Sequence, residues 1–279
     1  MEKQLPRRWA GFTLSRPLIM GILNVTPDSF SDGGRHHETE AAIAAGRAML
    51  AAGADILDIG GESTRPGSTE VAPAEEQARI LPVIRALAEV GATISVDTRH
   101  AATMAAALDA GARIINDVTA LTHDPAALPL AAARGCPVVL MHMRGTPATM
   151  SSLNHYGDIG REVAAELGLQ VAAALEAGVA REAIVTDPGF GFAKVGPQNV
   201  ALLRDLSPLR DLGFPMLIGL SRKGFIGALS GEPVADRRLG GSLAGALFAL
   251  TQGAAILRVH DVAETAQAVR VWQGLGDAG

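Results

Sequence analysis

The sequence predicts an α/β protein of the (β/α)₈ TIM-barrel class, with a single domain over residues 1–279 and its core over about 18–275. Three observations predict this fold. Short apolar runs recur eight times, Ala-rich helix-forming segments separate them, and no linker or low-complexity segment divides the chain. The runs are apolar throughout, which is typical of parallel strands covered by helices. An open doubly wound sheet is the alternative, but it usually has fewer strands, and its glycine-rich turn G-x-G-x-x-G follows none of the predicted strands.

The eight apolar runs are the predicted strands. In chain order they are 18–25 (LIMGILNV), 55–61 (DILDIGG), 93–98 (TISVDT), 113–118 (RIINDV), 137–143 (PVVLMHM), 183–189 (AIVTDPG), 215–221 (PMLIGLS) and 254–260 (AAILRVH). Predicted helices lie between them, as in 38–53 and 73–91, where apolar residues recur at helical spacing. Gly53, Gly91 and Gly111 follow such segments, as glycine often does after a helix.

Composition limits the classes of partner. The net charge of −5 argues against nucleic acid as the main partner, although a local cluster of Arg and Lys could still bind a small anion. Aromatic residues make up only 4% of the chain, so stacking platforms for sugars are few. The single cysteine, Cys136, predicts a buried thiol in a reducing, cytoplasmic setting. Neither a signal peptide nor an apolar run of about 18 residues is found, so no membrane association is expected.

Polar residues end every predicted strand, and the active site of a TIM barrel lies at these carboxyl ends. A strand-terminal Asp or Asn is often only the cap of the next helix, worth about 0.5–2 kcal/mol. We assign Asp117 and Asp261 to such caps, and Asn24 alone could be one. Caps do not account for the whole set, which is Asn24; Asp58, Glu62, Thr64 and Arg65; Asp97; Asn116; His142; Asp187; Ser221, Arg222 and Lys223; and Arg258 and His260.

These strand ends predict a site with two chemical characters. Asp97, Asn116 and Asp187 offer acceptors, which suit a flat heterocycle rich in N–H donors. Asn24 adds a neutral oxygen of the kind that holds Mg²⁺ beside a phosphate. The remaining polar groups offer positive charge for a phosphate or diphosphate, namely Arg65, Lys223, Arg258 and His260.

Two segments, 20–34 (MGILNVTPDSFSDGG) and 58–68 (DIGGESTRPGS), resemble the signature segments of the dihydropteroate synthase family. The resemblance runs in the family's order from Met20 to about Val262, through SVDT, INDV, MHMRGTP, TDPGFGFAK, GLSRKGFIG and LRVHDV. The family condenses 7,8-dihydropterin-6-ylmethyl diphosphate with 4-aminobenzoate, giving 7,8-dihydropteroate and diphosphate in folate biosynthesis. The resemblance therefore implies a cytoplasmic transferase that uses Mg²⁺, forms a homodimer and is a target of sulfonamides.

The resemblance also implies a role for each matching residue. The catalytic set is Asp97, Asp187, Lys223, Arg258 and His260. The pterin pocket is Asp97, Asn116, Met141, Asp187, Phe192 and Lys223. The diphosphate site is Asn24, Thr64, Arg65, Arg258 and His260, with Asn24 holding the metal. The aminobenzoate site is Thr64, Pro66, Phe192, Ser221 and Lys223. A loop carrying Asp28, Phe30 and Ser31 is expected to order over the second substrate. No covalent intermediate is expected, because the attacking arylamine is already neutral.

Other functions remain to be weighed. A pterin-binding methyltransferase would share the acidic pocket but has little use for Arg65, Arg258 and His260. A non-catalytic pterin-binding relative should have changes at Asn24, Arg65 or Lys223, and none is seen. A glycosidase would need carboxylates such as Asp58 and Glu62. The chain departs from the family at 193–195 (AKV), where relatives often carry Gly-Lys-Thr, and at 151–159 (SSLNHYGDI). The second segment overlaps the long loop 144–157, a candidate flap. The first change is harmless unless the backbone there has a positive φ.

Overall fold

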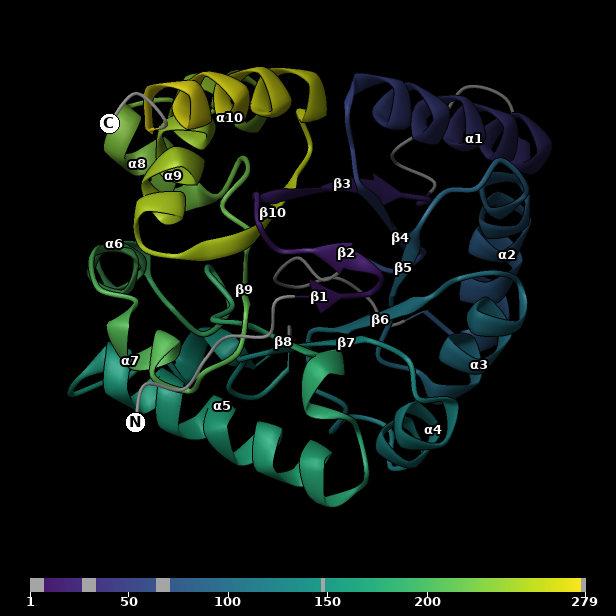
Figure 1. Cartoon of the computed structure of the whole chain (residues 1–279), viewed down its shortest axis with the longest axis horizontal. Helices are drawn as coiled ribbons and strands as arrows, with labels where there is room; N and C mark the ends of the chain where they lie inside the picture. Colours follow the sequence, from purple (N-terminus) through teal and green to yellow (C-terminus); the bar gives the residue numbers. More distant parts are fainter. Residues whose placement is uncertain (1–7, 27–33, 64–70, 147–148, 277–279) are drawn as a thin grey trace.

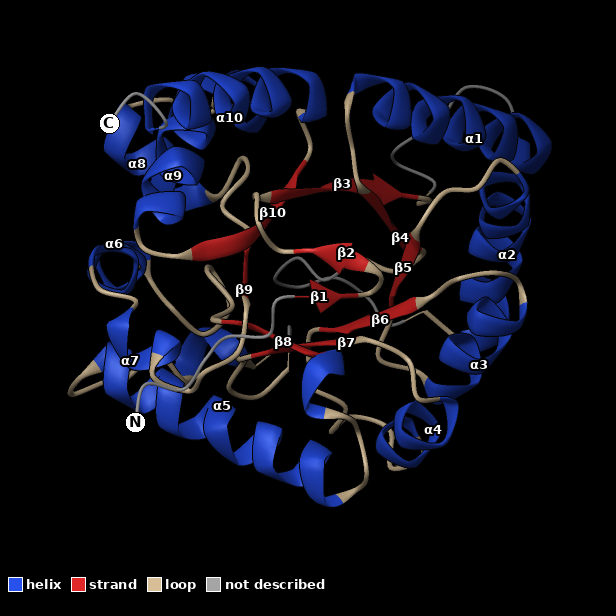
Figure 2. Ribbon diagram, viewed as in Figure 1, coloured by secondary structure: helices blue, strands red, loops and turns tan. Residues whose placement is uncertain are grey.

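The structure is a computed structural model and describes residues 8–26, 34–63, 71–146 and 149–276. Eight parallel strands pair into a closed barrel, and Figures 1 and 2, drawn from the same side, show the strands as an inner ring. Each predicted strand overlaps one barrel strand, so the predicted TIM barrel is confirmed. Around the barrel the strands are β10 (Ala254–Val259), β3 (Leu18–Asn24), β4 (Ile56–Gly60), β5 (Ile94–Asp97), β6 (Ile114–Asp117), β7 (Val138–Met141), β8 (Ile184–Asp187) and β9 (Met216–Ile218).

Helices surround the barrel as an outer ring (Figure 2). They are α1 (Gly34–Ala52), α2 (Pro73–Glu89), α3 (Ala101–Asp109), α4 (Ala127–Arg134), α5 (Ile159–Glu176), α6 (Gly196–Arg204), α7 (Ser207–Arg210), α8 (Gly224–Ser230), α9 (Leu239–Thr251) and α10 (Val262–Gly276), with short 3₁₀ turns at Met150–Ser152, Arg181–Ala183 and Ala235–Arg237. The glycines predicted to end helices, Gly53, Gly91 and Gly111, all have positive φ, as that role requires. Within the described residues, no helix is both long and apolar enough to cross a membrane.

The two-residue period of each strand divides the apolar side chains between two cores. Ile19 and Leu23 of β3 pack outward against the helices, and Cys136 lies buried in this outer layer as a free thiol, as predicted. Leu18 and Met20 of the same strand point into the barrel. They join a small inner core that also contains Ile56, Ile114, Val139, Val185, Leu217 and Ile256. The inner core lies near the strand starts and leaves the carboxyl ends for polar groups.

A short hairpin, which no pattern in the sequence predicted, closes the other end of the barrel. Strands β1 (Arg8–Trp9) and β2 (Phe12–Thr13) pair through a two-residue turn in which Ala10 and Gly11 both have positive φ. Figure 1 shows this hairpin in the middle of the strand ring. Trp9 is 1% exposed, packs on the inner core and donates from Nε1 to the carbonyl of Ala183 at 2.9 Å.

Candidate active site

A layer of polar side chains lies directly above the inner apolar core. Asp58, Asn116, Asp187 and Arg258 each stand two positions after an inward-facing apolar residue of the same strand, so the strand period aims them into the barrel as well. The four preceding apolar residues are Ile56, Ile114, Val185 and Ile256. The sequence therefore stacks a charged layer on an apolar one at the mouth where barrel enzymes place their chemistry.

Arg258 is the centre of this layer. Its Nε donates to Asp58 Oδ2 at 2.6 Å and its Nη2 donates to Asp97 Oδ2 at 2.6 Å. Asn116 donates from Nδ2 to the same Asp58 oxygen at 3.0 Å, while Asp58 Oδ1 is buried and has no hydrogen-bond partner among the described residues. Burial opposes the charge of Arg258, but Asp58 and Asp97 outweigh it and raise the pKa of the guanidinium. The structure thus joins the predicted residues Asp97, Asn116 and Arg258, and adds Asp58.

The two carboxylates predicted to bind the pterin, Asp97 and Asp187, have pKa values near neutral pH. Burial raises the pKa of Asp97 to about 7, although Arg258 opposes the shift. Burial also raises the pKa of Asp187 to about 6, against the backbone N–H of Gly189, which donates to Oδ1 at 2.7 Å, and against the charge of Lys223. Met141, at the end of β7, pairs in register with Asp187 and is buried beside it. A ligand that donates N–H groups to these carboxylates would replace the water that burial removes.

Lys223 brings a cation to the edge of the same pocket. It directly precedes α8, and its Nζ lies 4.5 Å from the centroid of the Phe192 ring, within reach of a cation–π contact. Gly191 lies against the Lys223 stem, since a Cβ there would stand 3.4 Å from Lys223 Cδ. Burial and the nearby Arg258 lower the pKa of Lys223 to about 8, and Asp187 opposes this shift. The predicted partners Phe192 and Lys223 are therefore in contact.

Ser221 and His260 form a second polar pair. Ser221 Oγ lies 2.9 Å from His260 Nδ1 and accepts the backbone N–H of His260 at 3.2 Å. Burial, together with Arg222 and Arg258, lowers the pKa of His260 to about 4. The neutral ring is therefore favoured at pH 7 in the free protein, and the role of His260 as a positive group at the diphosphate stays a prediction. Of the two residues predicted to be caps, Asp117 does bind the backbone that follows it, because its carboxylate accepts the N–H groups of Thr119 and Leu121. The carboxylate of Asp261 instead pairs with Arg222 at 2.6 Å.

Asn24 fits the metal role that the resemblance implies. It ends β3 at the carboxyl side of the barrel, is partly exposed, and its side chain makes no hydrogen bond to the described residues. A single neutral oxygen is enough for Mg²⁺ when a diphosphate and waters supply the other ligands. Glu62, Glu76 and His100 are also close enough together to suit an ion. Glu62, however, already forms a two-point ion pair with Arg99, at 2.9 and 3.2 Å, which opposes a second cation.

The same contacts argue against a glycosidase. The proposed carboxylate pair was Asp58 and Glu62, but Arg258 binds Asp58 and Arg99 binds Glu62. Neither carboxylate has the environment of a proton donor or a nucleophile for sugars. Six predicted site residues lie outside the described residues, and their roles stay predictions. They are Asp28, Phe30 and Ser31 of the expected loop cover, and Thr64, Arg65 and Pro66 of the second signature segment.

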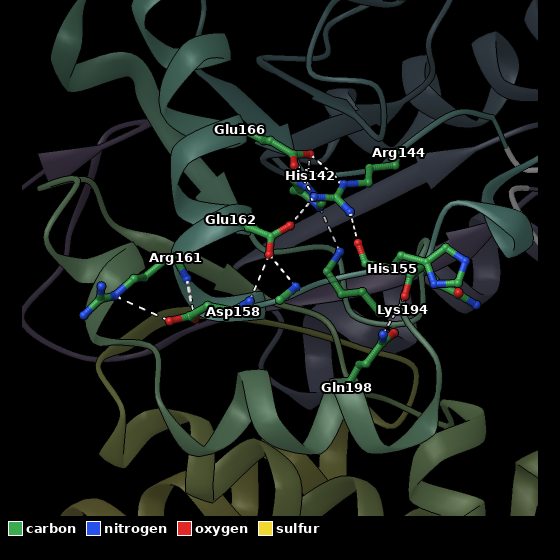
Figure 3. A network of polar contacts seen from close by, with 11 residues as sticks. His142, Arg144, His155, Asp158, Arg161, Glu162, Glu166, Lys194 and Gln198 are labelled. Atoms are coloured by element: carbon green, nitrogen blue, oxygen red, sulfur yellow. Dashed lines mark hydrogen bonds and ion pairs between the residues drawn. The ribbon is translucent and has the colours of Figure 1, made fainter.

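A buried network behind the pocket was not assigned a role from the sequence. Lys194 is 6% exposed, and its Nζ lies 2.9 Å from His142 Nδ1, while His142 Nε2 lies 3.0 Å from Glu166 Oε2. Figure 3 shows Arg144 on the other side of Glu166, paired with both Glu166 and Glu162. Burial lowers the pKa of Lys194 to about 7 and that of His142 to about 4. The signal in the sequence was a lysine inside the segment TDPGFGFAK, close after a strand end.

Known proteins share both the sequence and the fold. The profile of the Pterin binding enzyme family matches residues 20–260. Dihydropteroate synthase of Escherichia coli (strain K12) is 48% identical over 259 residues, which cover 92% of this chain and 91% of that protein. The corresponding enzyme of Synechocystis sp. is 46% identical over 261 residues, covering 93% of this chain and 90% of the relative.

Solved structures give the same result. Dihydropteroate synthase of Xanthomonas albilineans, solved with 4-aminobenzoic acid, superposes with a TM-score of 0.91 at 48% identity over the full length of both chains. The Yersinia pestis enzyme, solved as a sulfonamide drug complex, superposes with a TM-score of 0.90 at 45% identity and covers 96% of this chain and 97% of that one. The family profile, the related sequences and the solved structures all indicate the same family. The chain belongs to the dihydropteroate synthase family of pterin-binding enzymes.

Proposed function

We propose that this chain is the transferase that condenses 7,8-dihydropterin-6-ylmethyl diphosphate with 4-aminobenzoate in folate biosynthesis. The observation that carries the proposal is the buried group of Arg258, Asp97 and Asp58 beside Asp187 and Lys223, in a chain of this family. Xanthomonas albilineans relatives were solved with 4-aminobenzoic acid and with 7,8-dihydropteroate, one substrate and the product of this reaction. The Yersinia pestis complex supports sulfonamides as competitors of aminobenzoate.

The positions of the described residues support separate roles in binding the pterin and the aminobenzoate. Asp97, Asn116 and Asp187 would accept N–H donors of the pterin ring, between Met141 on one side and Phe192 on the other. Lys223 would bind the ring and adjoin the aminobenzoate, together with Ser221. When the diphosphate leaves, positive charge develops on the pterin methylene, and the buried carboxylates stabilise it because they lie in a site of low dielectric.

The leaving group needs the opposite charge. Mg²⁺, held by Asn24, would supply charge neutralisation to the departing diphosphate. Arg258 keeps Nη1 free of the two carboxylates that its other nitrogens bind, so one edge of the guanidinium can face the diphosphate. His260 starts as a neutral donor next to Ser221, and an approaching diphosphate would raise its pKa and favour the charged ring.

Assembly and location are part of the proposal. Exposed apolar side chains on three helices at one side of the barrel support a homodimer, namely Leu229 of α8, Phe248 of α9 and Leu275 of α10. Helix α9 packs against both α8 and α10, so the three helices are neighbours in the outer ring (Figure 1). Sedimentation equilibrium tests this directly, and Phe248→Asp should shift the mass toward the monomer. The lone reduced Cys136 supports a cytoplasmic enzyme.

Diphosphate release tests the function. Purified protein should release diphosphate when the pterin diphosphate, 4-aminobenzoate and Mg²⁺ are all present, and should stop when any of the three is omitted. Mass spectrometry of the same mixture should detect 7,8-dihydropteroate. Release without aminobenzoate, or no release above background, would contradict the proposal. A methyltransferase or a non-catalytic pterin-binding protein would fail the assay while still binding a pterin.

A further inference from the structure

The buried ammonium of Lys194 has all three of its N–H groups engaged. Its Nζ lies 2.9 Å from His142 Nδ1, 3.0 Å from the carbonyl of Gly189 and 2.9 Å from the carbonyl of Phe192. His142 Nε2 faces the Glu166 carboxylate, so the hydrogen-bond network assigns the ring proton to Nε2 and leaves Nδ1 as an acceptor. Three acceptors around one nitrogen are what an ammonium group requires.

Lys194 is one of three side chains that bind the backbone of the turn 189–193, together with Asp187, which accepts the N–H of Gly189, and Asn199, which accepts the N–H of Gly191. Gly189, Gly191 and Ala193 have φ values of 67°, 80° and 49°, so every second residue of the turn is left-handed. The N–H of Phe192 donates to the carbonyl of Gly189 at 3.1 Å, which is the same carbonyl that Lys194 binds. Lys194 therefore binds the turn at both ends of that internal hydrogen bond.

The turn carries the aromatic ring of the pterin pocket. Phe192 lies inside it, and the Phe192 ring is 4.5 Å from Lys223 Nζ. Gly191 packs on the stem of Lys223, and a Cβ at Gly191 would also lie 3.6 Å from that Nζ. Lys194 binds the carbonyl of Phe192 itself and that of Gly189, three residues earlier. If these two carbonyls moved, the backbone that carries the Phe192 ring would move with them, and the contact of the ring with Lys223 would change.

On its other side the network reaches the segment after β7. Glu166 of α5 accepts from His142 and pairs with Arg144, and Arg144 Nη1 donates to the carbonyl of His155 at 2.6 Å. Figure 3 shows these groups in one continuous chain of contacts that includes Lys194. The turn of the pocket is thus linked through Lys194, His142 and Glu166 to helix α5 of the outer ring.

We propose that Lys194 is a positioning residue for pterin binding: it fixes the turn 189–193, and through it the Phe192 ring against Lys223, without itself contacting the pterin. The proposal rests on the proposed function, because it assumes that Phe192 and Lys223 face the pterin. Lys194 is closed off by its three hydrogen-bond partners and is 6% exposed, so its effect on a ligand must pass through the turn.

A double-mutant cycle in binding tests the proposal. Calorimetry measures the affinity for 7,8-dihydropterin-6-ylmethyl diphosphate with Mg²⁺ in the wild type, Lys194→Met, Phe192→Leu and the double variant. Lys194→Met should weaken binding about tenfold, because it removes charge-assisted hydrogen bonds that hold the turn. In the Phe192→Leu background the same change should cost less than about twofold, because both residues act through one contact.

A remote cation serves as the matched control. Arg181 also donates to a backbone carbonyl, that of Gly213 at 2.8 Å, and lies 4.1 Å from the centroid of the Phe214 ring, but it precedes β8 at the opposite end of the strand. Arg181→Met should lower the melting temperature and leave the pterin affinity unchanged. If Lys194→Met does not fold, Glu166→Gln replaces it in the same cycle, with an expected loss of about threefold because it weakens the His142 anchor.

Two results would overturn the proposal. One is a Lys194→Met protein with a lowered melting temperature and wild-type pterin affinity, which would make Lys194 purely structural. The other is an equal loss of affinity in the wild-type and Phe192→Leu backgrounds, which would mean that Lys194 does not act through Phe192. A wild-type protein that binds no pterin diphosphate at all would contradict the proposed function instead, so the two failures are distinguishable.

Discussion

Arg258 Nη2 donates to Asp97 Oδ2 at 2.6 Å, although 161 positions separate the two residues in the chain. The same guanidinium binds Asp58 through Nε, and Asp58 is fully buried. One cation therefore compensates two carboxylates, only one of which was predicted to face the pterin. Removing the cation and removing the ligand-facing carboxylate should consequently have different effects on the fold.

Arg258→Met should lower the free energy of unfolding by about 3–5 kcal/mol, because it leaves the charge of Asp58 buried without a partner. Asp97→Asn keeps the pair of Arg258 and Asp58 and should cost less than about 1.5 kcal/mol. Its pterin affinity should nevertheless fall on the order of 100-fold, since an amide replaces a charged acceptor. Urea denaturation and calorimetry measure the two quantities. Equal destabilisation by both variants, or unchanged pterin affinity in Asp97→Asn, would contradict this assignment.

The pH profile of kcat/KM for the pterin diphosphate should be bell-shaped. Pterin binding needs the carboxylates of Asp187 and Asp97, whose pKa values burial raises to about 6 and about 7, and the ammonium of Lys223, whose pKa burial lowers to about 8. Activity should therefore rise as the pH increases through about 6 to 7 and fall as it increases through about 8. Asp187→Asn should be slow at every pH and keep only the acid limb near pH 7 that Asp97 causes. A wild-type profile that is flat from about pH 5 to 9 would exclude these groups.

The contribution of Asp187 to folding stability should fall as the pH rises through about 6, the range in which activity should increase. The pKa of Asp187 is raised from 3.8 in the unfolded chain to about 6 in the folded protein, so the folded state binds the proton more tightly. The contribution of Asp187 to stability is then greatest below about pH 4 and is lost as the pH rises through about 6. The difference in unfolding free energy between the wild type and Asp187→Asn, measured by urea denaturation across this range, isolates this contribution. A difference that grows more favourable to the wild type with rising pH would contradict it.

Much of the site could be predicted because its residues follow local rules. The apolar runs mark the strands, and the topology of a barrel brings all eight carboxyl ends to one mouth, so Asp97, Asn116, Asp187 and Arg258 were found together. The partner of Arg258 was missed because no local pattern records an ion pair between positions 58 and 258. The strand period does place Asp58 inside the barrel, two positions after Ile56.

The charge states depended on burial, which the sequence does not give. His260 is predicted to carry positive charge at the diphosphate, whereas in the free protein its neighbours include Arg222 and Arg258, and burial acts in the same direction to favour the neutral ring. The hairpin of β1 and β2 was missed for a different reason. Each strand is two residues long, which is too short for any period, and only the turn at Ala10 and Gly11 gave a local signal.

Ala193 occupies a backbone position that favours glycine. Alanine at this position is harmless only where φ is negative, and φ of Ala193 is 49°. Ala193→Gly should raise the free energy of unfolding by about 0.5–1 kcal/mol, because glycine adopts the left-handed region without the steric cost of a Cβ. The same exchange at Ala106, within helix α3, should lower it by about 0.5–1 kcal/mol. Urea denaturation of both variants checks the opposite signs, and a loss of stability in Ala193→Gly would show that packing of the buried methyl group dominates.

Trp9 should stabilise the barrel from its closed end, far from the chemistry. The side chain is 1% exposed against the inner core, so Trp9→Ala should lower the free energy of unfolding by about 3–5 kcal/mol. Trp9→Phe keeps most of the apolar contact but removes the hydrogen bond to the carbonyl of Ala183. Its free energy of unfolding should fall by only about 1–2 kcal/mol, because one carbonyl loses its partner and some side-chain volume is lost. Trp272 of α10 is partly exposed and belongs to the outer layer, which makes Trp272→Ala the matched control with a smaller loss of unfolding free energy.

Both Trp9 variants should retain wild-type pterin affinity while folded, because the inner apolar core separates Trp9 from Arg258 and Asp97. A Trp9→Ala protein as stable as the wild type would mean that the hairpin does not close the barrel in solution.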